Sequence, residues 1–298
     1  MKTDYSLEWF QERAFKSLKK IKEGQWDYSD PSLIYVPDEE EKYETVQQSG
    51  SRYHELITEP EKKYLEQIAP IVANALPNDF EYIDLGPGNA HKEQYIFDAL
   101  KALGKKFKYI PVDIDKKYLD LAARHAERQG IEVSDAQLLF EELPYRLPAS
   151  HTPRFVSIGM TFTNYAPDTI LPLLKKIAGQ SGYVLTNSQI RERLDMAAVT
   201  DVYQDEVYAL LETKIRLLGL RPSDLEKQWC DDGIRAWFKI KNVSQDLSKL
   251  GVRAGDEFLA YYFFRPTIKS LSESFSRHFD SFKLLDINAA FVAGLLFT

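Results

Sequence analysis

The fold of this chain is decided by Tyr82-Ile83-Asp84-Leu85-Gly86-Pro87-Gly88-Asn89-Ala90-His91-Lys92. Before the two glycines, residues 80–85 form an apolar run typical of a buried strand. After them, apolar side chains recur at helical spacing, at Ile96, Phe97, Leu100 and Leu103. The stretch therefore predicts a strand, a tight loop and a helix. Glycines in such a loop allow positive φ and close approach of a ligand, and the first N–H groups of the helix have no partner within it.

This loop has the character of a nucleoside-cofactor site. A dinucleotide site needs a third glycine at the sixth position of G-x-G-x-x-G, where the helix approaches its strand, and this chain has His91 there. NAD is therefore disfavoured. Asp84 in the strand and Asp113 at the end of the next strand favour S-adenosylmethionine (SAM), whose ribose hydroxyls can donate to a carboxylate. The alternative is a glycine turn that binds no ligand.

Composition narrows the classes of partner. A formal net charge of −7 and a pI near 5.4 argue against a nucleic-acid-binding surface, which needs clustered Lys and Arg. The one cysteine, Cys230, excludes an internal disulfide, and no Cys/His spacing resembles a zinc site, so we expect no metal. No apolar run approaches the roughly 20 residues that span a bilayer. We expect a cytoplasmic protein without a membrane partner, and the oligomeric state stays open.

Strands and helices alternate after the glycine loop. The expected strands are 107–112, 154–158 and 183–186, and the expected helices are 91–103, 117–129 and 167–178. This alternation predicts a parallel α/β sheet that binds ligands at the carboxyl ends of its strands. We assign residues 66–190 and 266–298 to this core, which closes with a helix over 267–279 and a hairpin of 282–287 with 291–297.

Two segments lie outside this pattern. Residues 1–65 are expected to be a helical N-terminal segment, with helix over 1–30 and a polar, charged stretch over 30–52 that suits a lid. Residues 191–265 are expected to form an inserted α+β unit that binds the substrate. Its predicted helices lie within 191–219, and its predicted strands lie at 234–243, near 247–252 and at 257–264.

The loop after the strand 154–158 carries a second polar cluster, Gly159 to Asn164, at a strand's carboxyl end. The carbonyl of Asn164 can accept a hydrogen bond from an amine and direct the nitrogen lone pair towards a methyl group. The alternative is an Asn in a turn, or one that caps the helix starting at Pro167. Thr161 in the same loop is a candidate cofactor contact.

Two charged residues have competing interpretations. Asp113 suits ribose binding, or it caps a loop at the end of its strand. Lys92 lies in the first turn of a helix, where a cation opposes the macrodipole. It suits the carboxylate of the methionine moiety, or it is a solvated lysine.

The motif Gly86-x-Gly88 with Lys92, Asp113 and the segment ending at Asn164 resembles the histidine-specific SAM-dependent methyltransferases. The best-known member of that family methylates the α-amine of histidine. The resemblance extends in pieces from residue 50 to the C-terminal hairpin. It implies a Rossmann-like class I methyltransferase core with an inserted substrate-binding unit. It also implies the following site residues: Gly86, Gly88, Lys92, Asp113, Phe140 and Thr161 for the cofactor, Asn164 and Tyr203 for catalysis, and Tyr53, Asn164, Tyr203, Leu259 and Tyr261 for the substrate.

The chain departs from the family's pattern at Lys62-Lys63-Tyr64, where the family has a tyrosine pair followed by proline, and at three positions of the expected binding sites. Leu139 stands where the family has an aspartate beside the adenine. Leu259 and Tyr261 stand where the family has a glutamate and a serine that hold the imidazole of histidine. Leucine cannot replace a buried hydrogen-bond acceptor without loss of that pairing, so a larger or more apolar amine is favoured over histidine.

The resemblance and the residues together predict an N-methyltransferase that acts on the amine of an amino acid or a related small molecule. A first rival is a methyltransferase for hydroxyl groups or proteins on the same core. Hydroxyl methylation would call for a general base, and the loop at Asn164 has none. A second rival is a non-catalytic SAM-binding fold, which Leu139 supports, whereas Gly86, Gly88 and Asp113 argue against it.

Overall fold

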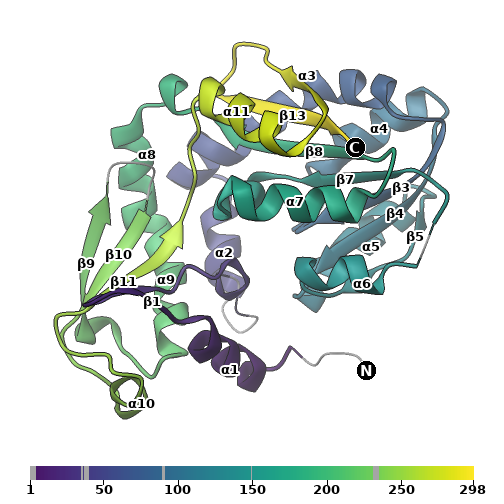
Figure 1. Ribbon diagram of the computed structural model, residues 1–298. Helices are drawn as coiled ribbons and strands as arrows, with labels where there is room; N and C mark the ends of the chain where they lie inside the picture. Colours follow the sequence, from purple (N-terminus) through teal and green to yellow (C-terminus); the bar gives the residue numbers. More distant parts are fainter. Residues whose placement is uncertain (1–4, 35, 37–39, 89–90, 149, 231–234) are drawn as a thin grey trace. The chain divides into compact units, whose positions relative to one another are not determined.

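The computed structural model describes residues 5–34, 36, 40–88, 91–148, 150–230 and 235–298 (Figure 1). Asn89 and Ala90 of the glycine loop, and residues 35 and 37–39 of the predicted lid, lie outside this description. The chain divides into two compact units, one of residues 1–58 and 195–264 and the other of residues 59–194 and 265–298. Each unit is therefore built from two separate segments. The N-terminal segment and the insertion, which the sequence treats as separate parts, share the first unit.

The second unit is built on an eight-stranded sheet (Figure 1). Its main strand order is β12 (Ser281–Leu285), β13 (Phe291–Phe297), β8 (Tyr183–Gln189), β7 (Arg154–Ile158), β3 (Asp79–Leu85), β4 (Lys106–Asp113) and β5 (Glu132–Val133). The short strand β6 (Ala136–Gln137) also pairs with β4. The pairs from β8 to β5 are parallel, and β13 runs antiparallel to both β8 and β12. The predicted Rossmann-like α/β core and its closing hairpin are confirmed.

Helices connect these strands, and those over 93–102, 116–127, 167–178 and 268–278 lie at predicted places, whereas the short helix over 143–146 was not predicted. The helices are α3 (Glu59–Ala75), α4 (Glu93–Ala102), α5 (Lys116–Glu127), α6 (Leu143–Arg146), α7 (Pro167–Ala178) and α11 (Ile268–His278). Gly104 and Gly130 follow α4 and α5 with φ of +65° and +73°, in the left-handed conformation that ends helices. The sequence predicts the bounds of α7 and β7 correctly.

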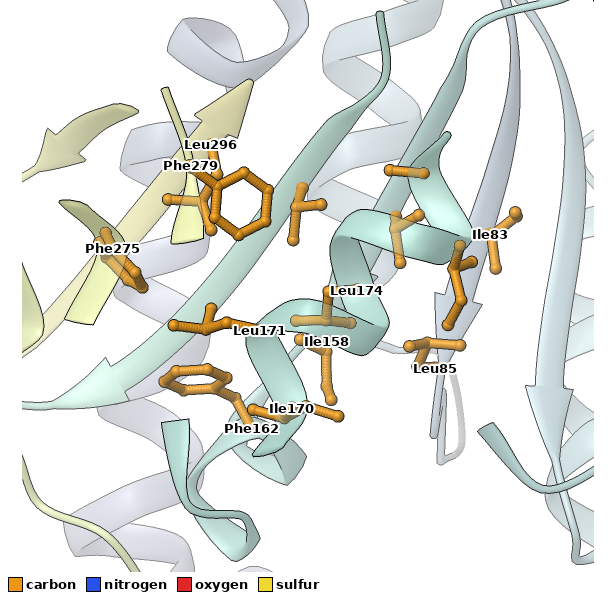
Figure 2. Close-up of a cluster of buried hydrophobic side chains, with 14 of the residues drawn as sticks. Ile83, Leu85, Ile158, Phe162, Ile170, Leu171, Leu174, Phe275, Phe279 and Leu296 are labelled. Atoms are coloured by element: carbon orange, nitrogen blue, oxygen red, sulfur yellow. The ribbon is translucent and has the colours of Figure 1, made fainter. Parts of the chain in front are cut away.

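The apolar core of this unit lies between the sheet and helices α7 and α11 (Figure 2). Ile83 and Leu85 of β3 belong to this cluster together with Leu174 of α7. Because side chains alternate across a strand, Tyr82 and Asp84 face the opposite side of the sheet. Tyr82 there contacts the ring of Phe97 in α4, with ring centroids 5.9 Å apart.

The strand order places the glycine loop at a switch point of the sheet. After β3 the chain continues outward to β4 and β5, and it then returns to pair β7 with the other side of β3. The helices that follow β3 and β7 consequently leave in opposite directions along the sheet. A crevice at such a point is where open α/β sheets bind ligands, so the topology supports a ligand site beside Gly86.

The first unit has its own five-stranded sheet. The order is β1 (Lys19–Lys22), β2 (Gln25–Asp27), β11 (Glu257–Tyr262), β10 (Arg235–Ile240) and β9 (Leu225–Cys230), and its helices are α1 (Leu7–Ser17), α2 (Glu40–Gln47), α8 (Met196–Val202), α9 (Tyr208–Arg216) and α10 (Gln245–Lys249). Strand β2 pairs in parallel with β11, which joins the N-terminal segment to the insertion. The rings of Trp26 and Phe238 each stack on Phe258 in the core.

Two expectations for this unit are wrong. Residues 1–30 are not helical throughout, because α1 ends at Ser17 and a β-hairpin follows, with Gly24 at φ +73° between β1 and β2. The apolar residue Ile21, which continued the helical spacing, is 52% exposed and therefore contributes nothing to a buried face. The strand expected near 247–252 is the helix α10, because the hydroxyl of Ser244 accepts from the backbone N–H of Leu247 and caps it.

No helix among the described residues is long and apolar enough to cross a membrane.

Candidate cofactor and substrate sites

Three predicted cofactor residues, Gly86, Thr161 and Phe140, lie together at the glycine loop. Gly86 and Gly88 have φ of +69° and +57°, in the region that favours glycine. The backbone N–H of Gly86 donates to the carbonyl of Val112 at 2.9 Å, which ties the loop to β4. A Cβ atom on Gly86 would lie 3.1 Å from Oγ1 of Thr161 and 3.7 Å from Cζ of Phe140. Glycine therefore leaves open a space that these side chains border.

Asp113 ends β4 beside this loop. Its Oδ1 accepts from the backbone N–H of Asp115 at 2.9 Å, which is the loop-capping role considered above. Burial raises the pKa of Asp113 to about 7, and the neighbouring Asp115 carboxylate adds to the shift, while backbone N–H groups oppose it. Asp113 thus caps its own loop, and it also lies next to the space beside Gly86 where we expect the cofactor.

Lys92 is not a solvated lysine. It directly precedes α4, and its Nζ donates to Oε2 of Glu61 at 2.7 Å. Oε1 of Glu61 accepts from Nδ2 of Asn187 in β8 at 2.9 Å. The sequence analysis missed Glu61, whereas Asn187 directly follows the predicted strand 183–186, on the rim where such a sheet is expected to bind its ligand. Glu61 lies at helical spacing with the apolar residues Tyr64, Leu65 and Ile68, and a carboxylate in such an apolar stripe is a usable signal.

A buried polar cluster extends from this ion pair. Asp84 accepts from the hydroxyl of Ser157 at 2.6 Å and from that of Tyr109 at 2.7 Å. Burial raises the pKa of Asp84, and burial together with the Asp84 charge raises that of Glu93 well above its usual value. Asp84, Glu93 and Ser157 border a cavity of about 30 Å³, enough for a water molecule. Its polar lining comprises Glu61, Tyr82, Asp84, Lys92, Glu93, Ser157 and Asn187.

Asn164 ends the 3₁₀ helix η5 (Met160–Asn164), which follows β7. It is 7% exposed. The first residue before α7 is Ala166, so Asn164 does not cap that helix. The neighbouring Thr163 hydroxyl donates to the carbonyl of Met160 at 2.8 Å and accepts from the buried Arg265 at 3.4 Å. These two bonds hold the loop, one from within its own turn and one from Arg265, the first residue of the second unit's C-terminal segment.

Apart from Asn164, which belongs to the second unit, the predicted substrate residues lie in the first unit, and three of them are tyrosines in contact with other aromatic rings. The ring centroids of Tyr53 and Tyr203 are 6.0 Å apart. Phe263, which the sequence analysis missed, lies 4.7 Å from Tyr203 and 5.4 Å from Tyr261 by the same measure. Leu259 occupies the same strand as Tyr261, and its carbonyl accepts from the backbone N–H of Tyr28 at 2.8 Å.

Tyr53 and Tyr203 each lie at the start of a π-helical turn. Tyr53 directly precedes the turn His54–Thr58, and Tyr203 begins the turn Tyr203–Val207. Such turns are rare and occur often at functional sites. Within the described residues, no group of three or more His, Cys, Asp or Glu side chains is placed to hold a metal ion.

Comparison with known proteins identifies the family. The model of the histidine-specific, SAM-dependent methyltransferases matches residues 48–206, more than half of the chain. The chain belongs to this family. The predicted family is confirmed, and the family's description agrees with the predicted enzyme class and cofactor. The match runs from the segment of Tyr53 to that of Tyr203 and includes the glycine loop and Asn164.

Individual relatives are more distant. The chain is 29% identical over 124 residues to the histidine N-alpha-methyltransferase of Mycobacterium tuberculosis (strain CDC 1551 / Oshkosh), a match that covers 41% of this chain and 38% of that protein. A SAM-dependent methyltransferase structure from Clostridium acetobutylicum is 13% identical with a TM-score of 0.46, over 87% of this chain and 98% of that one. A plantazolicin methyltransferase in complex with SAH is 11% identical with a TM-score of 0.42, over 97% and 99%.

Proposed function

We propose that this chain transfers a methyl group from SAM to the amine of an amino acid or a related small molecule other than histidine. The observation that carries the proposal is that Gly86, Thr161 and Phe140 lie together beside Asp113, at the switch point of the parallel sheet. This part of the chain matches the model of the methyltransferase family. An N-methyltransferase needs this cofactor cradle and a polar group that orients the acceptor nitrogen, and Asn164 supplies that group.

The proposed cofactor contacts follow from the chemistry of each residue. The backbone at Gly86 and Gly88 approaches the adenosyl part, and Thr161 borders it. Asp113 accepts from the ribose hydroxyls, and the aromatic ring of Phe140 covers the adenine. Leu139 offers no side-chain acceptor to the adenine amine, so stacking on Phe140 carries more of its binding.

The acceptor chemistry rests on Asn164. SAM, when bound, supplies a methyl group on a sulfonium, which an amine lone pair can take by in-line displacement to leave S-adenosylhomocysteine (SAH). The amide carbonyl of Asn164 accepts from the amine N–H and aims the lone pair. Residues 159–166 contain no His, Asp or Glu that would serve as a general base for a hydroxyl. An amine is therefore favoured over an alcohol.

The proposed acceptor is more apolar than histidine. Tyr53, Tyr203 and Tyr261 form an aromatic cluster with Phe263, and Leu259 stands where the family pattern has an imidazole-binding glutamate. Aromatic walls bind apolar side chains and, through their π faces, ammonium groups. An amino acid with a large apolar or aromatic side chain fits these residues better than an imidazole.

The test is methyl transfer itself. The protein is incubated with SAM that carries an isotope-labelled methyl group and with a panel of free amino acids and small amines. Mass spectrometry of the products identifies the acceptor and the number of labelled methyl groups. We expect label on an aliphatic nitrogen of an apolar or aromatic amino acid and none on histidine. Labelled histidine, or label on oxygen alone, would contradict the proposal.

A further inference from the structure

The ion pair between Lys92 and Glu61 is part of a buried chain of three residues from three elements. Nζ of Lys92 donates to Glu61 at 2.7 Å, and Nδ2 of Asn187 donates to the other oxygen of the same carboxylate at 2.9 Å. Glu61 comes from the first turn of α3, Asn187 from β8, and Lys92 from the residue before α4. Glu61 and Asn187 are each 2% exposed.

This burial makes the pair different from a surface salt bridge. A carboxylate removed from water is tolerated only if its oxygens are paired, and both oxygens of Glu61 have a donor. Asn187 therefore fixes the direction in which Glu61 faces. The lysine side chain is still 26% exposed, so it can be approached by a ligand.

The charge on Lys92 is secured by its surroundings. Burial alone would lower its pKa, but the adjacent carboxylate of Glu61 outweighs burial and raises it. An ammonium group has three N–H donors, and Glu61 accepts one of them. Lys92 therefore stays charged near neutral pH and keeps donors for a second acceptor.

The pair also lies next to the candidate cofactor loop. A Cβ atom on Gly159 would lie 3.6 Å from Oε1 of Glu61 and 3.9 Å from Nζ of Lys92. Gly159 directly precedes η5, which contains Thr161, and Thr161 borders Gly86. The ammonium group is thus held at the end of β7, beside the segment that also borders Gly86.

We propose that Glu61, held by Asn187, is a positioning residue that orients Lys92 for the carboxylate of the SAM methionine moiety. This inference rests on the proposed function. A free lysine side chain loses its rotamer freedom when it binds a ligand, whereas the ion pair with Glu61 restricts it beforehand. Glu61 thereby improves binding of ligands that carry the amino-acid part, and it does not affect ligands that lack it.

Two ligands separate this role from a general structural one. SAH contains the amino-acid part, and 5′-methylthioadenosine has the same adenosyl group without it. Dissociation constants of both are measured by isothermal titration calorimetry for the wild-type protein, Glu61→Gln, Lys92→Met and the double variant. Glu59→Gln is the matched control, because Glu59, in the same turn of α3, forms a partly buried ion pair with Lys62 and not with Lys92.

We expect Glu61→Gln to weaken SAH binding by about two- to tenfold, the scale of immobilising one side chain, and to leave 5′-methylthioadenosine unchanged. In the Lys92→Met background the same substitution should have no further effect, because Glu61 acts through Lys92. Asn187→Ala should reproduce the SAH loss in smaller measure, and it serves if Glu61→Gln does not fold. Glu59→Gln should bind both ligands as the wild type does.

Other outcomes would overturn the inference. Equal losses for both ligands would make Glu61 a structural residue. A gain in SAH affinity would mean that Glu61 competes with the ligand for Lys92. A full effect in the Lys92→Met background would mean that Glu61 does not act through the lysine. A wild-type protein that binds neither ligand would refute the proposed function as well, whereas a wild-type protein that binds both leaves that proposal standing.

Discussion

The carboxylate of Glu206 accepts a hydrogen bond from the backbone N–H of Tyr53 at 3.0 Å. It also accepts from the backbone N–H of Arg52 at 2.9 Å. One side chain from the second π-helical turn thereby caps the start of the first. The hydrogen bonds of Glu206 therefore hold the segments of the proposed substrate tyrosines, Tyr53 and Tyr203, close together. The two tyrosine rings take no part in these bonds.

Glu206→Ala should release this cap. We expect the backbone amides of residues 52 and 53 to exchange hydrogen about fivefold faster, because a lost helix cap costs about 1 kcal/mol. Hydrogen exchange followed by mass spectrometry of peptides over 48–58 measures this rate. Asp205→Asn is the control, since it breaks only the exposed ion pair with Arg52. Equal acceleration in both variants would show that Glu206 has no capping role.

Gly86→Ala and Gly88→Ala should differ in their effect on stability. Both force alanine into a left-handed conformation, at a cost of about 1–2 kcal/mol. Only at Gly86 does the new methyl group also meet a side chain, Thr161, at 3.1 Å, while nothing lies within 4 Å at Gly88. Urea unfolding should show the larger loss for Gly86→Ala. The added substitution Thr161→Ala should recover part of that loss, and full additivity of the two changes would contradict the contact.

SAH binding should weaken as the pH falls below about 7. Burial raises the pKa of Asp113 to about 7, and only the deprotonated carboxylate is a pure acceptor for ribose hydroxyls. Below this pKa, each fall of one pH unit lowers the fraction of free protein with a deprotonated Asp113 by about tenfold. The apparent dissociation constant should therefore rise by up to about tenfold for each pH unit. Titrations from pH 5.5 to 8.5 measure it. Asp113→Asn should bind more weakly and without this dependence, and an identical pH profile would exclude Asp113.

The free energy of unfolding should rise with pH above about 7 because of Lys214. This side chain is fully buried, and its Nζ donates to the carbonyls of Ala260 and Asp30 and lies 4.8 Å from the ring centroid of Tyr28. Burial lowers its pKa from 10.5 to about 7. Between these values the unfolded chain binds more protons than the folded one, so stability increases with pH by up to about 1.4 kcal/mol per unit.

Urea unfolding at pH 7.5 and 9.0 tests this increase. Lys214→Met should remove that part of the pH dependence, whereas Lys249→Met, which alters an exposed lysine, should keep it. The same slope in the wild type and in Lys214→Met would assign the dependence to other groups.

Asn164→Ala should reduce turnover more than cofactor binding. The amide orients the acceptor nitrogen, and loss of orientation costs on the order of 10- to 100-fold in rate. We expect this loss in kcat with the acceptor found by isotope labelling, together with an SAH dissociation constant within about twofold of the wild type. Asn74→Ala on the exposed face of α3 is the control. Equal losses in turnover and in SAH affinity would place Asn164 in the cofactor site instead.

The α/β core could be predicted because its signals are local. The two glycines after β3, the glycines that end α4 and α5, and the proline that starts α7 each act within a few residues. The first unit depends on pairing between distant segments. Strand β2 is three residues long and pairs with β11 more than two hundred residues later, which no local pattern encodes.

The candidate cofactor site was predicted in part for the same reason. Gly86, Asp113 and Thr161 lie at or just after the carboxyl ends of strands that meet in a parallel sheet, so their proximity follows from topology. Glu61 comes from a helix and Asn187 from a strand, and the contacts of Glu61 with Asn187 and Lys92 depend on tertiary packing. Only the presence of a carboxylate in the apolar stripe of α3 pointed towards Glu61 in advance.

The antiparallel strand β13 completes the sheet between β8 and β12, and this sets an order of events on the ribosome. When β8 has been synthesised, one edge stays bare until about 100 more residues have emerged, because β13 begins at Phe291. The intervening residues include β9, β10 and β11, which complete the sheet of the other unit. A nascent chain that ends after β11 therefore contains every strand of the first unit's sheet, while β8 still lacks its partner β13.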